Sequence, residues 1–315
     1  MPISRDEVIA IYRYVLGREP ESEAVIEAQC NRFDKVHDFR IAAIQSMEFS
    51  YIIRDLGVGF SVVDREKWVK TDIRNGLSIW VDLHDKHVSW GCFNDNWEEP
   101  TVRFILNRIA EGEIFIDIGA NVGWFTLLVA QKMRQLGSGH VVAFEPRQNL
   151  YEATARSIAE NGLDSFVTLH KLALADRTGE MELIWAHGDT GASFLATRGV
   201  LPHEKHETVR LARLDDFSFI DPVRIIKSDA EGAEGLIFLS AENVLATHRP
   251  VIVSELNFQR LPYVSGITAG ELINWLSDHH YTCHTLNEEG ELGETIKATS
   301  DTSSPATKVV FLPHS

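Results

Sequence analysis

Short apolar runs alternate with stretches of helical periodicity from residue 111 onward. The runs have the length and the branched side chains of buried strands, while the intervening stretches repeat apolar residues at helical spacing. We expect strands at IFIDI, VVAFE, VTLHKLAL, VRIIKSD, VIVSEL, YTCHTL and KVVFL, and helices over 122–135, 148–161, 233–247 and 269–279. This order predicts an α/β fold with a doubly wound, mainly parallel sheet.

Two further extended pieces, MELIWAH and TVRLARL, precede the run VRIIKSD. The stretch between them, from Gly188 to Glu207, is polar and has neither strand nor helix period. Loops of this length inside a compact domain are commonly functional. We therefore expect this one to cover a site.

The N-terminal part is expected to be helical. Ser4 and Glu7 form a capping box ahead of apolar residues at helical spacing. A second helix is expected near Pro20, and a third from Val36 to about Phe49. These helices define a small module over residues 1–60.

An alternating pattern follows between residues 62 and 93. The pair Asn75-Gly76 stands ahead of LSIWVDL and then HVSWGCF, which indicates a short β-hairpin or meander. We interpret residues 61–110 as a β-hairpin adaptor or flap, and residues 111–315 as the α/β domain.

Composition narrows the possible partners. The chain has 315 residues, of which 44% are hydrophobic, and 46 Asp and Glu stand against 30 Lys and Arg. A formal net charge of -16 would repel a nucleic-acid backbone, so we expect no nucleic-acid partner. No run approaches the ~20 apolar residues of a membrane span, and the N-terminus lacks the pattern of a signal peptide. We expect a cytoplasmic protein whose three separated cysteines are reduced.

The segment DIGANVG lies where a buried strand turns into a helix, a position where doubly wound sheets bind ligands. It lacks the G-x-G-x-x-G of a dinucleotide site, which disfavours a nucleotide-dependent oxidoreductase. The next acid at a strand end is Glu145, which is followed by Pro146. S-adenosylmethionine fits this pattern, because Glu145 can bind both ribose hydroxyls and Asp117 can accept from the ammonium group. Gly119 and Gly123 would let the methionine part approach the backbone. The alternative is a tight turn with no ligand.

The chain resembles FkbM-type class I methyltransferases over most of residues 97 to 260. The resemblance rests on FIDIGANVGWFTLLVA, VVAFEPRQNLYEATARSIAENGL, LALADRTGEMEL, RLDDF, IIKSDAEGAE and RPVIVSEL, in that order. It implies a Rossmann-like fold, S-adenosylmethionine as the donor, and O-methylation, often of sugars or natural products. The implied donor site contains Asp117, Gly119, Ala120, Asn121, Gly123, Phe125, Glu145 and Pro146, with Ala173 near the adenine and Glu99 from NWEEP.

The N-terminal YRYVLGREPESE resembles a helical module appended to bacterial enzymes of surface-polysaccharide assembly. This resemblance implies a glycan acceptor, and docking to a glycan-assembly complex through residues 1–60. The alternative is a helical extension that only stabilises the catalytic domain.

The segment IIKSDAEGAE supplies the candidates for chemistry on the acceptor. Lys227, Asp229 and Glu231 lie at the end of an otherwise apolar strand, and an alkyl hydroxyl that is methylated needs a base for its proton. Asp229 and Glu231 are the candidate bases, although Lys227 and Asp229 are also expected as a structural ion pair.

Three residues outside that segment are candidates for the acceptor site. Glu255 and Asn257 are expected to hold acceptor hydroxyls, and His187 is an outside candidate for the base. Asp229 and Glu255 could share a divalent ion, but two acids are a sparse ligand set, so we predict no metal site.

The leading hypothesis is a methyltransferase that uses S-adenosylmethionine to methylate a hydroxyl of a sugar or sugar-containing acceptor. A protein that binds the donor without turnover and docks on a glycan-assembly complex is the alternative from another class. Methylation of a small molecule that is not a sugar is the alternative within the same class.

Overall fold

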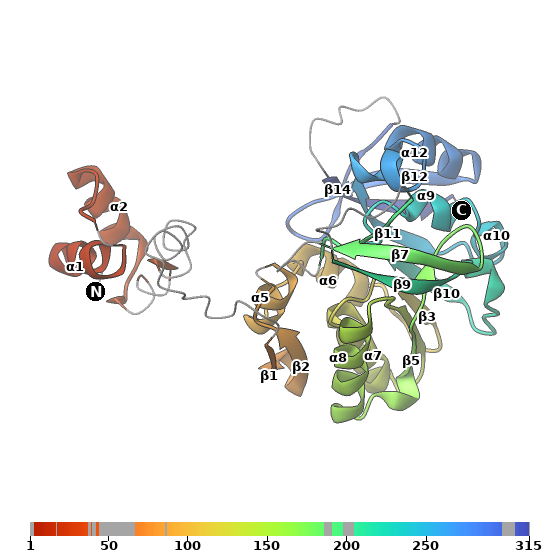
Figure 1. Cartoon of the computed structure of the whole chain (residues 1–315), viewed down its shortest axis with the longest axis horizontal. Helices are drawn as coiled ribbons and strands as arrows, with labels where there is room; N and C mark the ends of the chain where they lie inside the picture. Colours follow the sequence, from red (N-terminus) through yellow and green to blue (C-terminus); the bar gives the residue numbers. More distant parts are fainter. Residues whose placement is uncertain are drawn as a thin grey trace. The chain divides into compact units, whose positions relative to one another are not determined.

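The computed structural model describes residues 3–16, 18–36, 39, 42–43, 67–85, 87–185, 191–197, 205–297 and 306–314. The chain divides into two compact units, Met1–Arg65 and Glu66–Ser315 (Figure 1). The candidate site lies in the second unit.

The N-terminal unit contains α1 (Arg5–Val15) and α2 (Glu23–Arg32). The predicted capping box is present, with the Ser4 N–H donating to Glu7 Oε2 at 2.7 Å. A small core of its own is formed by Ile3, Val8, Ile11, Tyr12, Leu16, Ile26, Phe39 and Ala43. The first two predicted helices are therefore confirmed, whereas the third, from Val36 to Phe49, falls largely outside the described residues.

The second unit is built on an eight-stranded sheet with the order β13-β12-β14-β11-β10-β3-β4-β5. Its strands are β3 (Ile114–Ile118), β4 (His140–Phe144), β5 (Val167–His170), β10 (Val223–Ser228), β11 (Val251–Asn257), β12 (Tyr281–Leu286), β13 (Leu292–Thr295) and β14 (Ala306–Pro313). The neighbouring strands β11, β10, β3, β4 and β5 are parallel, and β14, β12 and β13 extend the sheet by antiparallel pairing. The predicted doubly wound, mainly parallel α/β sheet is confirmed, and the strand order reverses between β3 and β10.

Helices cover both faces of this sheet (Figure 1). They are α7 (Trp124–Leu136), α8 (Gln148–Glu160), α9 (Glu234–Phe238), α10 (Glu242–His248), α11 (Arg260–Val264) and α12 (Ala269–Asp278). Strand alternation divides the core, since Ile116 and Ile118 pack with α9, α10 and α12, while Phe115 packs with α7 and α8. The helix predicted over 233–247 is thus two helices, α9 and α10.

The predicted hairpin at Asn75-Gly76 is confirmed. Strands β1 (Trp68–Ile73) and β2 (Leu77–Asp82) pair in antiparallel fashion across η1 (Arg74–Gly76). Strand β2 lies against α8, because the Trp80 N–H donates to Ser157 Oγ at 3.0 Å and the Ser78 N–H to Asn161 Oδ1 at 2.9 Å. The hairpin therefore shares the core of the unit Glu66–Ser315.

The extended strand suggested for HVSWGCF is wrong, because these residues form α5 (Val88–Phe93). Asp85 accepts hydrogen bonds from the N–H groups of His87, at 3.0 Å, and Ser89, at 2.7 Å, which satisfies the start of the helix. Val88 and Cys92 are buried one helical turn apart. A second short helix, α6 (Glu99–Leu106), leads into β3.

A second sheet has the strand order β6-β9-β7-β8. It consists of β6 (Ala173–Leu174), β7 (Gly179–Trp185), β8 (Phe194–Leu195) and β9 (Lys205–Ala212). The short helix η3 (Leu214–Asp216) follows β9, and η2 (Asp164–Phe166) precedes β5 of the main sheet. The two predicted extended pieces thus form the antiparallel pair β7 and β9. Across the described part of both units, no helix combines the length and apolar character of a membrane span.

Candidate functional site

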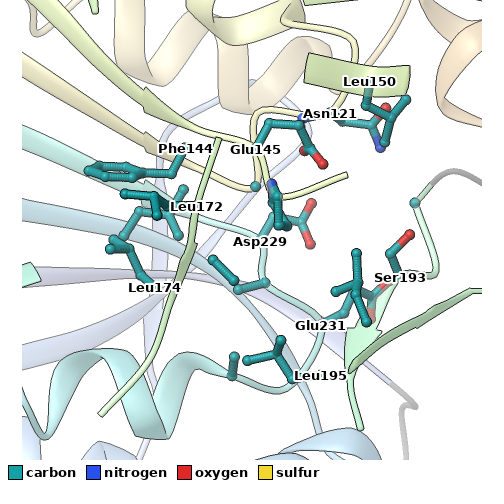
Figure 2. Close-up of a pocket in the computed structure, with 18 residues that line it drawn as sticks. Asn121, Phe144, Glu145, Leu150, Leu172, Leu174, Ser193, Leu195, Asp229 and Glu231 are labelled. Atoms are coloured by element: carbon teal, nitrogen blue, oxygen red, sulfur yellow. The ribbon is translucent and has the colours of Figure 1, made fainter. Parts of the chain in front are cut away.

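A cavity opens at the carboxyl ends of β3, β4 and β10, next to the point where the strand order reverses. It encloses about 570 Å³ of empty space, including the part open to solvent. Carboxylates of Glu145, Asp229 and Glu231 lie on one side of it, and Phe144, Leu172 and Leu174 gather on another (Figure 2). The cavity therefore offers both acceptors and an apolar surface.

Gly119 follows β3 and lies against Asp229, the residue that follows β10, at the edge of the cavity. Its φ is +75°, and a Cβ atom there would lie 2.1 Å from the backbone oxygen of Asp229. Glycine is therefore required both by the left-handed backbone and by the close approach of the β3 and β10 ends. The predicted Gly119 thus lines the cavity, in contact with the predicted Asp229.

Glu145 follows β4 and is buried at the cavity. Its Oε2 accepts from the Asn121 N–H at 2.8 Å, and its Oε1 accepts from the Arg147 N–H at 3.0 Å. Burial raises the pKa of this carboxyl to about 7, against the opposing effect of the two backbone donors. Since each carboxylate oxygen can accept about two hydrogen bonds, Glu145 retains acceptor capacity for a pair of hydroxyls.

The apolar side of the cavity comes from the strand that follows β5. Leu172, Ala173 and Leu174 lie there, with Phe144 at the end of β4. The Phe144 ring is itself fixed by stacking on His170 at 5.1 Å between centroids. Ala173, which was predicted to lie near the adenine, thus lines the cavity as part of this apolar wall.

Asp117 does not line the cavity. Strand alternation places it on the α7 face, where its Oδ2 accepts from Thr126 Oγ1 at 2.7 Å and its Oδ1 lies 3.6 Å from Lys227 Nζ. Lys227 Nζ also donates to the Gly119 oxygen at 3.2 Å and lies 5.1 Å from the centre of the Phe125 ring. Asp117, Lys227 and Phe125 therefore support the Gly119 turn from inside the protein.

Four other residues predicted for the donor site occupy different places. Asn121 and Pro146 line the cavity. Ala120 is buried, and its N–H donates to the Phe144 oxygen at 3.0 Å. Gly123 has φ +86° and begins α7 against Thr154, away from the lining residues.

The loop after β10 turns its acids toward the cavity. Glu234 is fully buried and accepts from the N–H groups of Ala230, at 2.7 Å, and Gly232, at 2.9 Å, which shapes the loop. Glu231, with φ 50°, lines the cavity together with Asp229. Burial and the neighbouring Asp229 raise the pKa of Glu231 to about 8.

Glu231 has two polar neighbours at the cavity edge. Arg260 Nη1 lies 2.9 Å from its Oε2, and Asn257 Nδ2 donates to the same oxygen at 3.2 Å. The predicted Asn257 therefore does not line the cavity but orients Glu231. His187 lies outside the described residues, whereas Gly191, Ser193 and Leu195, from the predicted covering stretch, line the cavity.

Lys308 gathers three carboxylates beside Asp229. Its Nζ lies 2.6 Å from Glu98 Oε1, 2.6 Å from Glu255 Oε2 and 3.8 Å from Asp229 Oδ2. Lys227 Nζ is 4.0 Å from the same Asp229 oxygen, so the expected Lys227–Asp229 pair is present. Burial acts to raise the pKa of Asp229, but the cations Lys308, Lys227 and Arg260 lower it below its ordinary value.

Two residues of this cluster, Glu98 and Lys308, were not predicted. The motif NWEEP contains two acids, and Glu99 was the one chosen. Glu99 instead lies 2.6 Å from Arg74, while Glu98, whose φ is 47°, turns toward Lys308. Carboxylate oxygens of Glu98, Asp229 and Glu255 lie within 4.8 Å of one another, a separation at which they could hold a metal ion.

Comparison with known proteins identifies the family. A family model described as "Methyltransferase FkbM domain" matches residues 117–283. Among solved structures, the chain is similar to a methyltransferase FkbM from Methylobacillus flagellatus, with 16% identity, TM-score 0.42, and coverage of 65% of this chain and 44% of that one. The chain thus spans less than half the length of that relative. No curated protein matches it.

Two further solved structures are methyltransferases. The chain is similar to a TehB-like SAM-dependent methyltransferase from Corynebacterium glutamicum, with 12% identity, TM-score 0.40, and coverage of 71% and 92% of the two chains. A precorrin-6y C5,15-methyltransferase from Geobacter metallireducens has 15% identity and TM-score 0.38, with coverage of 70% and 89%.

Proposed function

This chain belongs to the FkbM methyltransferase domain family, and from that premise we propose that it transfers a methyl group from S-adenosylmethionine to a hydroxyl of a sugar-containing acceptor. The observation that supports the proposal is that one cavity is lined by the buried carboxylate of Glu145, by an apolar wall, and by the carboxylates of Asp229 and Glu231. We call Gly119, Asn121, Glu145 and the apolar wall the donor end, and Asp229 and Glu231 the acceptor end.

The donor end fits the ribose, the adenine ring and the methionine part of S-adenosylmethionine. Glu145 presents two oxygens to a vicinal diol, and the wall formed by Phe144, Leu172 and Leu174 presents an apolar face to an adenine ring. Gly119 lines the cavity where the methionine part would lie, and its missing side chain lets the β3 and β10 ends approach each other there. When bound, the donor supplies a methyl group on a positively charged sulfur, a charge that the anionic Asp229 favours.

The acceptor end provides the base. Glu231 receives the hydroxyl proton as the acceptor oxygen bonds to the methyl carbon and the carbon–sulfur electron pair stays on sulfur. Its pKa of about 8 suits a base near neutral pH better than that of Asp229, which Lys308 and Lys227 keep low. Arg260 and Asn257 orient Glu231 in this role.

A neutral acceptor rich in hydroxyls fits the acceptor end. Asp229, Glu231 and Ser193 offer oxygens that accept hydrogen bonds, and the net charge of -16 disfavours polyanions. The resemblance of the N-terminal module to those of polysaccharide-assembly enzymes supports a glycan, with residues 1–60 docking to an assembly complex.

The proposal is tested by incubating the full chain with S-adenosylmethionine and a library of sugars, nucleotide sugars and glycosides. The expected product carries one additional methyl group by mass spectrometry and is formed together with S-adenosylhomocysteine in equal amounts. The Glu231→Gln variant serves as the inactive control. Tight donor binding without transfer to any hydroxyl compound would contradict the proposal in favour of a binding protein.

A further inference from the structure

We propose that the ammonium group of Lys308 is a built-in cation that occupies the place a divalent metal ion would take among Glu98, Asp229 and Glu255. The three carboxylates would form a metal site if the lysine were absent. With the lysine present, methyl transfer proceeds without a metal ion, and this last clause alone rests on the proposed function.

The distances support this assignment. The oxygens of the three carboxylates lie within 4.8 Å of one another, about twice the ~2.0–2.6 Å bond that Mg²⁺ or Ca²⁺ forms with a carboxylate. Two of these oxygens, Glu98 Oε1 and Glu255 Oε2, each lie 2.6 Å from Lys308 Nζ. The ammonium group therefore lies where it contacts the same oxygens that a shared ion would contact.

The fold brings these groups together from four separate segments. Strand β14 inserts beside β11 in antiparallel register, which places Lys308 directly opposite Glu255. Asp229 follows β10, and Glu98 precedes α6 with a left-handed backbone at φ 47°. Glu98 and Lys308 both lie outside residues 117–283, which the family model matches.

The charges are consistent with a resident cation. Burial acts to lower the pKa of Lys308, but Asp229, Glu98 and Glu255 outweigh it and raise the pKa, so the amine stays protonated. Lys227 adds a second cation 4.0 Å from Asp229, and it also lies 3.6 Å from Asp117. A divalent ion would have to displace a covalently tethered cation and would meet Lys227 as well.

One atom of the cluster still has capacity for a ligand. Glu98 Oε2 is buried and accepts no hydrogen bond from the described residues. Removal of the lysine side chain would thus leave a set of oxygens that prefers a hard cation, with at least one oxygen already free of competing donors.

The role of such a cation differs from that of a metal. A lysine ammonium holds the carboxylates in place and keeps Asp229 ionised, but it does not act as a Lewis acid on the acceptor hydroxyl. The hydroxyl proton must then go to a side chain, which agrees with Glu231 as the base. Lys308 is therefore a positioning residue.

The test is Mn²⁺ binding to the full chain, measured by calorimetry and electron paramagnetic resonance without donor or acceptor. We expect the dissociation constant for Mn²⁺ at this cluster in the parent protein to be about 1 mM or higher. Lys308→Ala should gain one site whose dissociation constant is at least ~10-fold lower. The double variant Lys308→Ala with Glu255→Gln should lose that site. Lys70→Ala also removes a lysine from a carboxylate, that of Glu160, which keeps Arg156 as a partner, and this variant should gain no site.

A second variant, Lys308→Gln, tests the proposal if Lys308→Ala folds poorly. Lys308→Gln keeps most of the side-chain volume without the charge, and Mn²⁺ should raise its unfolding temperature but not that of the parent. A parent protein that binds one Mn²⁺ tightly, and loses it on Glu255→Gln, would overturn the proposal. A folded Lys308→Ala or Lys308→Gln protein that gains no Mn²⁺ site would overturn it equally.

These measurements are independent of the methylation assay, so the inference and the proposed function can fail separately. In that assay the parent should keep its turnover in the presence of a chelator. Loss of turnover that added Mg²⁺ restores would contradict the metal-independent transfer, even if the lysine occupies the cluster as inferred.

Discussion

The donor end and the acceptor end of the cavity are built in different ways. The donor end is formed by three short stretches within residues 119–174, in which backbone N–H groups donate to a single acid, Glu145. The acceptor end collects charged side chains from segments far apart in the chain, including Glu98 and Lys308. We therefore expect donor binding to depend mainly on backbone geometry, and chemistry on the acceptor to depend mainly on the balance of charges.

The largest effect is expected at the acceptor end. Glu231→Gln keeps the shape of the side chain but removes its basicity, so turnover should fall by about 10²- to 10⁴-fold. Affinity for S-adenosylhomocysteine should stay within about twofold of the parent value, because Glu231 is not placed at the ribose or adenine groups. Single-turnover kinetics and calorimetry measure the two quantities.

The matched control is Glu180→Gln, an exposed acid on β7, which should change neither quantity. If Glu231→Gln keeps near-normal turnover while Asp229→Asn loses it, the base is Asp229, and the low pKa that its cations impose does not prevent proton transfer.

The next effect concerns the contact that joins the two ends. Gly119→Ala places a Cβ atom 2.1 Å from the Asp229 oxygen in a left-handed backbone, so the β3 and β10 ends must separate. We expect a loss of about 2–4 kcal/mol in the free energy of unfolding, together with loss of donor binding. Chemical denaturation and calorimetry would measure these losses.

The control variant Gly112→Ala separates the cost of the left-handed backbone from the cost of the close contact with Asp229. Gly112 has a similar φ of +74°, but a Cβ atom there meets nothing within 4 Å. This variant should lose only about 1 kcal/mol and keep full donor binding. Equal losses in the two variants would mean that backbone conformation alone, and not the contact with Asp229, makes Gly119 necessary.

A smaller effect is expected from pH at the donor end. The pKa of Glu145 is raised from its ordinary 4.5 to about 7, so the folded protein holds a proton that the unfolded chain releases. The contribution of Glu145 to stability is therefore present below about pH 4.5 and is lost as the pH rises through about 7. The pH dependence of donor binding has the opposite sign to that of stability, because ribose hydroxyls donate best to the ionised carboxylate.

We therefore expect affinity for S-adenosylhomocysteine to increase between pH 6 and pH 8, by up to about tenfold, with proton release on binding below pH 7. Calorimetry in buffers of different ionisation enthalpy measures that release. Glu145→Gln should weaken binding by about 1.5–3 kcal/mol and remove the pH dependence. An unchanged pH dependence in this variant would exclude Glu145 as its source.

The two ends also differ in how far the sequence predicted them. Glu145 and Gly119, which line the cavity, both stand at strand ends within short motifs. The mainly parallel sheet followed from the periodicity, whereas the class I methyltransferase fold followed from the resemblance to the FkbM family. Asp117 shows the limit of that reasoning. The sequence places it at a strand end, but strand alternation turns its carboxylate toward Thr126 and away from the cavity.

The acceptor end was predicted only in part because its contacts depend on tertiary structure. Lys308 meets Glu255 through the register of β14 against β11, which no local pattern specifies. Glu99 was chosen over Glu98 because a sequence does not reveal the left-handed turn at Glu98. HVSWGCF was read as extended because its first turn is satisfied by Asp85, a residue outside the apolar pattern.

The smallest effect on donor binding is expected from removal of the N-terminal unit. Residues 66–315 contain every residue that lines the cavity, and the unit Met1–Arg65 has its own hydrophobic core. A fragment that starts at Glu66 should therefore fold and bind S-adenosylhomocysteine within about twofold of the full chain, as a separable domain does. Thermal unfolding and calorimetry on the two proteins measure the stability and the affinity.

A fragment that is insoluble or fails to bind would show that the first unit completes the fold of the second. Normal donor binding with turnover lost only on glycan acceptors would instead place the role of residues 1–60 at the acceptor end, as docking to a glycan or to its assembly complex requires.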